Sequence, residues 1–258
     1  MPQNKYFKLL VRERMAKTGE SYSVARMRLL QQTNEPQTKT PSAIAKVGAA
    51  LSLADGGPGV IYQIRLSLNG ISPTIWRRLQ VPADVRLHDL SLLLLGAMGW
   101  TNSHLHMFTA NGTHFGQPDP DWDDLDMPEI VDDRTVRLRR LVDAGARTFE
   151  FLYDFGDHWE HTVEIESADI APVAGVLYPS CTGGERACPP EDCGGTSGYE
   201  GLLEILADPA HEEHNDMRRW VGGHYDAGEF NLARTNAVLR RLSRRRRTPV
   251  RRAGELPM

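Results

Sequence analysis

The stretch TFEFLYDFGDHWEHTVEIE, residues 148–166, determines the fold that we expect for this chain. Apolar and polar side chains alternate along Thr148–Tyr153 and again along His161–Glu166, which is the two-residue period of half-buried β-strands. Asp154–His158 lies between them and supplies the Asp and Gly residues that turns favour. The stretch therefore predicts two strands joined through a short turn.

Further strands and one helix are predicted on the N-terminal side of this stretch. Tyr62–Leu68 alternates in the same way, and Asn69–Gly70 signals a turn after which Ile75–Val81 can pair back. His104–Phe108 is also typical of a strand. Leu87–Met98 has a helical pattern, and its dense run of leucines predicts burial in the core.

Helices are predicted on the C-terminal side, at residues 199–207, 212–221 and 232–242. Because strands come first and helices last, we expect an α+β fold with a largely antiparallel sheet and packed helices, rather than an alternating βαβ fold. The chain has 258 residues. This length suits one main domain, since single domains usually contain ~100–200 residues.

Composition divides the chain into four segments. Residues 1–31 are predicted to form a basic helical hairpin, in which Thr18–Ser21 supplies a glycine that ends one helix and a serine that caps the next. Residues 32–59, rich in Gln, Thr, Pro, Ser, Ala and Gly, are predicted to be a linker. The α+β domain is expected at residues 60–242, and an Arg-rich tail at residues 243–258.

Charge is unevenly distributed along the chain. Residues 1–50 contain nine Lys or Arg and three Glu, residues 51–239 contain thirteen Arg and thirty Asp or Glu, and residues 240–258 contain eight Arg and one Glu. An acidic body repels a phosphate backbone, because nucleic-acid affinity rests on Lys and Arg replacing condensed counterions. Contact with nucleic acid is therefore expected only through the basic ends. The other interpretation is that these ends are solvated, disordered extensions that bind no nucleic acid.

Composition also bears on location. The chain is 40% hydrophobic and 25% charged, and no apolar run approaches the ~18 residues of a membrane span. We expect no membrane insertion. The N-terminus lacks the apolar stretch and cleavage site of a secretory signal, and three cysteines, an odd number, fit a reduced compartment better than a disulfide framework. These features predict a cytoplasmic protein.

Metal-ligating side chains gather in and around the opening stretch. His104 and His106 lie two residues apart on one predicted strand, so they share a face on which two imidazoles can converge on a metal. Further candidates in the turn and the next strand are Asp154, Asp157, His158 and His161. The structural alternative is that Asp and Gly make the turn, Phe155 and Trp159 anchor it, and the histidines satisfy backbone groups.

A second group of ligands follows in a Gly- and Pro-rich loop. Three soft ligands occur there, at Cys181, Cys188 and Cys193. Zinc takes four ligands, so His158 or His161 would complete a Cys3His structural site. The spacing differs from paired C-x2-C knuckles, and three buried thiols are the alternative. Glu191 and Asp192 are acidic enough to bind a cation, although a solvated turn also explains them.

Five motifs carry a family resemblance: Tyr62–Leu66, Pro73–Arg78, Gly99–Phe108, Tyr153–His161 and Pro189–Gly195. Their order and wording resemble the plasmid pRiA4b ORF-3-like family over about residues 60–242. The resemblance implies a bacterial α+β domain of uncharacterised function, often encoded near mobile elements. Some relatives carry the label of a TnpR-type transposon resolvase. A serine recombinase needs a catalytic serine among arginines on a domain that grips DNA, and the acidic body here argues against that reaction.

Two function classes follow from these observations. The charge polarity and the lack of a complete catalytic signature predict a non-enzymatic accessory or interaction module associated with plasmids or mobile elements, whose acidic domain docks a protein partner. The alternative is a metal-dependent, hydrolase-like enzyme centred on the histidines and aspartates, with the cysteine loop nearby. The sequence leaves the cofactor of such an enzyme open, with zinc as one candidate.

Overall fold

The structure, a computed structural model, describes residues 59–118 and 129–244. The predicted hairpin 1–31, nearly all of the linker 32–59 and most of the tail 243–258 lie outside these residues. The described strands are β1 Ile61–Leu68, β2 Trp76–Pro82, β3 His106–Ala110, β4 Thr113–Gly116, β5 Ile130–Asp132, β6 Thr148–Tyr153, β7 Trp159–Ile170 and β8 Ser180–Glu185. The described helices are α4 Leu87–Met98, α5 Leu138–Asp143, α6 Gly195–Ala207, α7 His214–Trp220 and α8 Leu232–Arg244.

The described strands form one eight-stranded sheet in the order β5-β4-β3-β6-β7-β1-β2-β8. Neighbouring strands are antiparallel throughout, except that β4 and β5 are parallel. The predicted α+β class is confirmed. The two strands of the opening stretch pair as β6 and β7, with Tyr153 opposite Trp159, and β1 pairs back on β2 as the Asn69–Gly70 turn indicated.

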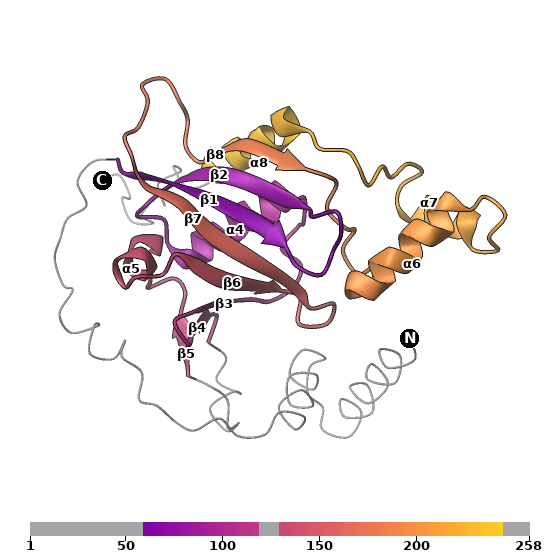
Figure 1. The fold of residues 1–258 in the computed structure, drawn as a ribbon, viewed down its shortest axis with the longest axis horizontal. Helices are drawn as coiled ribbons and strands as arrows, with labels where there is room; N and C mark the ends of the chain where they lie inside the picture. The colour runs from indigo at the N-terminus through magenta and orange to yellow at the C-terminus, as the bar shows by residue number, and fades with distance from the viewer. Residues whose placement is uncertain (1–58, 119–128, 245–258) are drawn as a thin grey trace, which may run out of the picture.

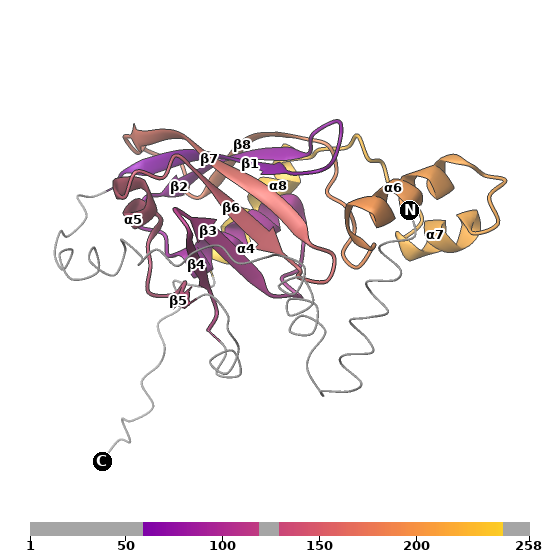
Figure 2. The same cartoon turned by 60° about the horizontal axis from the view of Figure 1, so that its bottom comes forward.

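One face of the sheet carries the core. Helix α4 packs against it and α8 lies alongside α4 and β8 (Figures 1 and 2). Leu90 and Leu94 of α4 are completely buried, which confirms the prediction from the leucine run, and each contributes roughly 1.5–3 kcal/mol. Gly96 allows α8 to approach closely, because a Cβ there would lie 2.8 Å from Leu242 Cδ1.

The opposite face of β1, β2 and β7 is polar. Arg65 and Arg78 lie over the Trp76 ring, with their guanidinium carbons 4.4 and 5.3 Å from the ring centre. Arg78 also donates two hydrogen bonds to Glu166, of 2.6 and 2.8 Å. Antiparallel sheets commonly bury one face and leave the other to solvent, which explains the alternation seen in these strands.

Four elements were not expected from the sequence: β4, β5, α5 and β8. Strand β8 contains Cys181 and two glycines, a composition with little strand propensity, and it forms through edge pairing with β2. His104 was expected in a strand, but β3 begins only at His106. Helix α6 begins at Gly195, four residues earlier than predicted, and with α7 it projects from the body (Figures 1 and 2).

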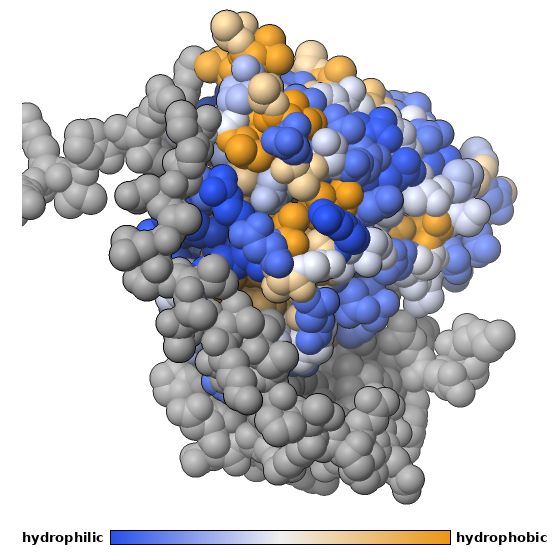
Figure 3. Space-filling view, turned by 60° about the vertical axis from the view of Figure 1, so that its left-hand side comes forward, coloured by the Kyte–Doolittle hydropathy of each residue, from blue (hydrophilic) through white to orange (hydrophobic). Residues whose placement is uncertain are grey.

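Exposed apolar side chains occur on the connection between β7 and β8. Val173, Val176 and Leu177 are 58%, 43% and 65% exposed. Figure 3 shows apolar residues gathered at the top of the molecule, where this connection lies, above a mostly hydrophilic body. Among the described residues, no helix has both the length and the apolar content that a membrane span needs.

Candidate metal centre

The turn 154–158 and the loop that carries the last two cysteines pack against each other. Asp157 Oδ2 accepts a hydrogen bond of 2.9 Å from the Gly194 backbone N–H. Gly195 follows with a φ of +73°, and a Cβ there would lie 2.4 Å from the Asp157 carbonyl oxygen. Only glycine fits this contact without a shift of the backbone. The two motifs that the sequence singled out therefore meet in space.

Glu191 ties this loop to the segment that precedes β3. Its carboxylate accepts hydrogen bonds of 2.8 Å from the Thr101 N–H, the Thr101 hydroxyl and the Tyr153 hydroxyl. Tyr153 in turn accepts from the Ser103 N–H at 3.0 Å. Burial raises the pKa of Tyr153. Burial also opposes ionisation of Glu191, but its hydrogen bonds hold the pKa of Glu191 below its ordinary value. The network fixes residues 101–104 against the loop.

A group of two partly exposed histidines and one buried aspartate lies at the start of β3. His106 Nε2 lies 2.8 Å from Asp133 Oδ2, and His88 Nδ1 lies 3.6 Å from the same oxygen. Asp133 is fully buried, and its other carboxylate oxygen, Oδ1, has no hydrogen-bond partner among the described residues. The three ligand atoms lie within 4.8 Å of one another. We call His88, His106 and Asp133 the buried triad.

Backbone pairing positions the buried triad. His88 stands in the first turn of α4, and its N–H donates to the Asp133 carbonyl at 3.2 Å. Asp133 directly follows β5, and its own N–H donates to the Gly116 carbonyl of β4 at 3.0 Å. The preceding helix residue, Leu87, donates to Val136 at 2.9 Å. Three segments that are distant in sequence are thereby held together.

The buried carboxylate of Asp133 needs partners that compensate for its loss of water. Burying an isolated carboxylate is costly unless a cation or hydrogen-bond donors compensate it. Among the described residues the ion-pair partners of Asp133 are His88 and His106, not arginine. Compensation can come from hydrogen bonds that the imidazoles donate or from a metal ion held between the three side chains. Two imidazoles and a carboxylate are a common metal ligand set that leaves coordination positions open.

A cavity of about 370 Å³ opens beside the buried triad. Its lining consists of His88, Asn102, Ser103, His104, Leu105, His106 and Gln117. Among the described residues no carboxylate belongs to that lining, although the domain as a whole is acidic. A ligand in this cavity would meet hydrogen-bond donors and imidazoles.

His104 borders the same cavity but belongs to a second group, with Asp154 and Asp192. His104 Nε2 lies 3.1 Å from Asp192 Oδ1 and 3.7 Å from Asp154 Oδ2. Both aspartates adopt left-handed backbone conformations, with φ of +54° and +59°. Burial raises the pKa of Asp154. We call these three residues the loop triad. The structure thus brings together three of the predicted candidates, and places His104 and His106 in different groups.

The two remaining histidines of the motif lie outside both triads. His158 Nε2 lies 2.8 Å from Glu160 near the surface. His161 is completely buried, its Nδ1 lies 3.0 Å from the Phe151 carbonyl oxygen, and its ring packs edge-on against Trp100. Burial lowers the pKa of His161 to about 4, so this imidazole is neutral at ordinary pH.

The cysteines are free thiols in different surroundings. Cys181 is buried in β8 and donates to the Gly183 carbonyl at 3.2 Å, whereas Cys188 and Cys193 are partly buried in the loop. Burial raises the pKa of Cys181 and of Cys188. In the described part of the chain, no group of three ligand atoms within 4.8 Å includes a cysteine. A zinc site that joins these cysteines to His158 or His161 stays a prediction.

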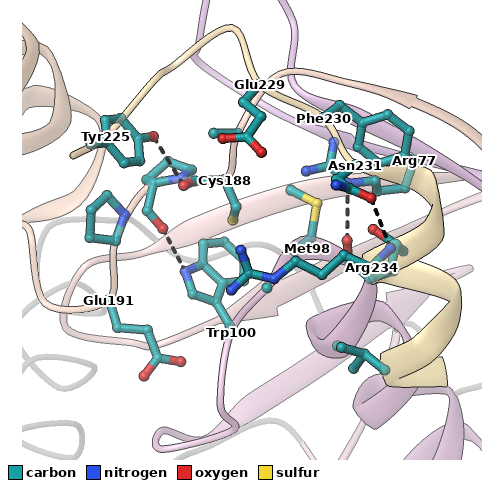
Figure 4. Close-up of a pocket in the computed structure, with 18 of the residues that line it drawn as sticks. Arg77, Met98, Trp100, Cys188, Glu191, Tyr225, Glu229, Phe230, Asn231 and Arg234 are labelled. Atoms are coloured by element: carbon teal, nitrogen blue, oxygen red, sulfur yellow. Dashed lines mark hydrogen bonds between the residues drawn. The ribbon is translucent and has the colours of Figure 1, made fainter. Parts of the chain in front are cut away.

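A larger cavity of about 600 Å³ lies between the end of α4, the cysteine loop and α8 (Figure 4). Arg77 is buried beside it and donates to the carbonyl oxygens of Trp76, Ala97, Glu185 and Arg186. Trp100 donates to Pro189, and Tyr225 donates to Cys188. These hydrogen bonds fix the Arg77, Trp100 and Tyr225 side chains in the wall of the cavity.

Sequence reasoning missed His88 and Asp133. Neither residue was among the metal ligands predicted from the sequence. The available signals were an imidazole at the beginning of an otherwise apolar helix and an acidic pair, Asp132 and Asp133, after a short apolar run. Neither signal indicates that the two residues meet, because the contact depends on the pairing of β4 with β5.

The fold and the triads define an α+β domain in which two clusters of histidine and aspartate each contribute histidine to the lining of one cavity. Residues 60–234 match the plasmid pRiA4b ORF-3-like protein family, and the chain belongs to this family. The uncharacterised protein y4hQ of Sinorhizobium fredii (strain NBRC 101917 / NGR234) is 40% identical over 181 residues, which cover 69% of this chain and 90% of the relative. The crystal structure of MM3350 from Methanosarcina mazei Go1, a protein of unknown function, is 35% identical with a TM-score of 0.60, covering 67% of this chain and 96% of that one.

Proposed function

We propose that this domain binds a divalent transition-metal ion at the buried triad, and that the ion acts as a Lewis acid in a hydrolytic reaction in the adjoining cavity. The observation that carries the proposal is the fully buried Asp133, whose Oδ1 lacks a hydrogen-bond partner in the described chain while two imidazoles flank its Oδ2. When bound, such a metal lowers the pKa of a coordinated water and polarises substrate oxygens.

Different residues of the chain would bind the metal and orient the substrate. His88 and His106 would supply imidazole nitrogens and Asp133 the single carboxylate, which matches the three protein ligands of many catalytic zinc sites. The donors that line the cavity, such as Asn102 and Ser103, would orient an oxygen-rich substrate. A structural zinc site is instead closed by four protein ligands, and the buried triad offers three.

Metal binding is the direct test. The full chain, stripped with a chelator and titrated with Zn²⁺ by calorimetry, should lose binding at this site when Asp133 is replaced by Asn or His106 by Gln. The matched control is Asp169→Asn, an exposed aspartate at the end of β7. If Asp133→Asn binds Zn²⁺ with the wild-type stoichiometry and affinity, the buried triad is not the metal site and the proposal is wrong.

A second candidate function is an accessory module, associated with a plasmid or mobile element, that docks a protein partner. The exposed Val173, Val176 and Leu177 on the β7–β8 connection support it, because contiguous exposed apolar residues commonly mark interaction sites. Replacing these three residues by Ser should abolish recovery of a partner in a pull-down from the native host. Equal recovery, or no partner together with no retention of DNA by the full chain at low salt, would count against this function.

A cytoplasmic location accompanies either function as part of the proposal. The three cysteines are free in the structure, as a reducing compartment would keep them. Fractionation of the host cell would test this location.

A further inference from the structure

We infer that the loop triad, His104, Asp154 and Asp192, is a second divalent-cation site, and its His104 lines the cavity that His88 and His106 of the buried triad also line. The inference extends the proposed function from one metal to two, but it rests on different residues. Its ligands are one imidazole and two carboxylates, so the expected ion is a borderline or hard divalent cation such as Mn²⁺.

The spacing of the ligand atoms is the first argument. Ligands that each lie ~2.1 Å from one ion, at angles between octahedral and tetrahedral values, are separated by roughly 3.0–3.4 Å. The separations from His104 Nε2 are 3.1 Å to Asp192 Oδ1 and 3.7 Å to Asp154 Oδ2. All three ligand atoms lie within 4.8 Å of one another. Small side-chain adjustments would therefore close them around a shared ion.

The direction of the His104 ring is the second argument. A distance of 3.1 Å is normal for an N–H···O hydrogen bond. Nevertheless His104 Nε2, a buried atom, makes no hydrogen bond with any described residue, so the carboxylate oxygens lie off the direction in which an N–H would donate. A buried imidazole nitrogen that lies near two carboxylates but bonds to neither has its coordinating position unused, as a metal ligand needs.

The third argument is that the side chains are held in place by separate anchors. The Asp154 N–H donates to the Leu105 carbonyl at 3.0 Å, and the Asp154 side chain is 9% exposed. Asp192 stands between Glu191, which is bonded to Thr101, and Gly194, which is bonded to Asp157. The ligands are thus preorganised by the packing of the turn on the loop, which reduces the cost of assembling a site.

The two triads differ in their number of carboxylates and therefore in the metal ion that each is expected to prefer. The loop triad places two carboxylates within 4.8 Å, and one divalent ion would neutralise both. The buried triad has one carboxylate and two imidazoles. Imidazole suits Zn²⁺, whereas carboxylate suits Mn²⁺ and Mg²⁺. The loop triad should therefore discriminate less strongly against Mn²⁺ than the buried triad does.

Stoichiometry tests the inference on the full chain. Elemental analysis and electron paramagnetic resonance after saturation with Mn²⁺, and calorimetry with Zn²⁺, should give two sites in the wild type. Asp192→Asn and His104→Gln should each remove the same one, with at least a tenfold loss of affinity, and Asp169→Asn should remove none. Because Asp192 is exposed and His104 is partly exposed, both variants should retain the wild-type circular dichroism.

The outcomes separate this inference from the proposed function. Loss of one site in Asp192→Asn and His104→Gln, with no loss in Asp133→Asn, would support the loop triad and overturn the buried triad. Loss of one site in Asp133→Asn, with no loss in Asp192→Asn and His104→Gln, would support the buried triad and overturn the loop triad. Wild-type stoichiometry and affinity in both Asp192→Asn and His104→Gln would overturn the inference.

Discussion

The buried triad and the loop triad are assembled by the chain in different ways. The buried triad draws on the first turn of α4, the start of β3 and the residue after β5, and its carboxylate is inaccessible to solvent. The loop triad draws on a turn and two irregular segments, and the Asp192 side chain is 70% exposed. The geometry of a site on helices and strands depends on the stability of the core, whereas the geometry of a site on loops depends on a few tertiary contacts.

The largest expected difference between the triads concerns stability without metal. Asp133→Ala should lower the free energy of unfolding by about 3–5 kcal/mol, because it leaves buried polar partners uncompensated. Asp192→Ala should change it by less than about 0.5 kcal/mol, as is usual for an exposed side chain. Urea denaturation of the chelator-treated proteins measures both values. Equal changes in the free energy of unfolding for the two substitutions would show that the two triads do not differ as a core site and a loop site.

A second comparison, between the buried His161 and the partly exposed His158, concerns the effect that burial of a histidine has on stability within one motif. Burial lowers the pKa of His161 to about 4 from an ordinary 6.5. In the unfolded chain His161 therefore binds a proton below pH 6.5, whereas in the folded chain it binds one only near pH 4. The stabilisation is complete above pH 6.5 and is lost as the pH falls toward 4, by about 3 kcal/mol in total.

Urea midpoints between pH 4 and 7 measure this dependence. His161→Leu should flatten the curve relative to the wild type, whatever its effect on absolute stability, and His158→Leu is the control for removing an imidazole of the same motif outside the core. Parallel curves for wild type and His161→Leu would show that the buried imidazole titrates normally.

The smallest effect concerns the contact on which the loop triad depends. Gly195→Ala places a methyl group 2.4 Å from the Asp157 carbonyl oxygen in a left-handed conformation, and it should cost about 2 kcal/mol. Gly201→Ala is the matched control, since a Cβ there meets nothing within 4 Å and alanine favours a helix by roughly 0.5–1 kcal/mol.

Metal titration of these variants completes the comparison. Gly195→Ala should weaken Mn²⁺ binding at the loop triad and leave Zn²⁺ binding at the buried triad intact. Equal weakening at both sites would mean that the triads form one structural unit.

Much of the sheet was predictable from local patterns. The alternation in residues 62–68 and 148–166 identified β1, β6 and β7, and the leucine run identified α4 with the observed bounds. The edge strands β4, β5 and β8 were not predictable, because they are short and their formation depends on pairing with a neighbour. Strand β8, with its glycines, shows that tertiary pairing overrides a weak local propensity.

The candidate site was predictable only in part. His104, Asp154 and Asp192 were among the expected ligands, and the structure groups them. His106 was expected beside His104, but its Nε2 contacts Asp133 instead. The expected cysteine ligands fall in no group of the described residues. Residue type alone indicates metal affinity, but it does not indicate which ligands share a position.

By itself the sequence determined the period of each strand, the turn and glycine positions, and the acidic character of the domain, since these depend on neighbouring residues and on composition. The tertiary structure decided which imidazole meets which carboxylate. His88 and Asp133 converge because sheet order brings β5 beside β4 and the start of α4 beside both. That order results from burial of the whole sheet against α4 and α8, a property of the complete core that no local pattern contains.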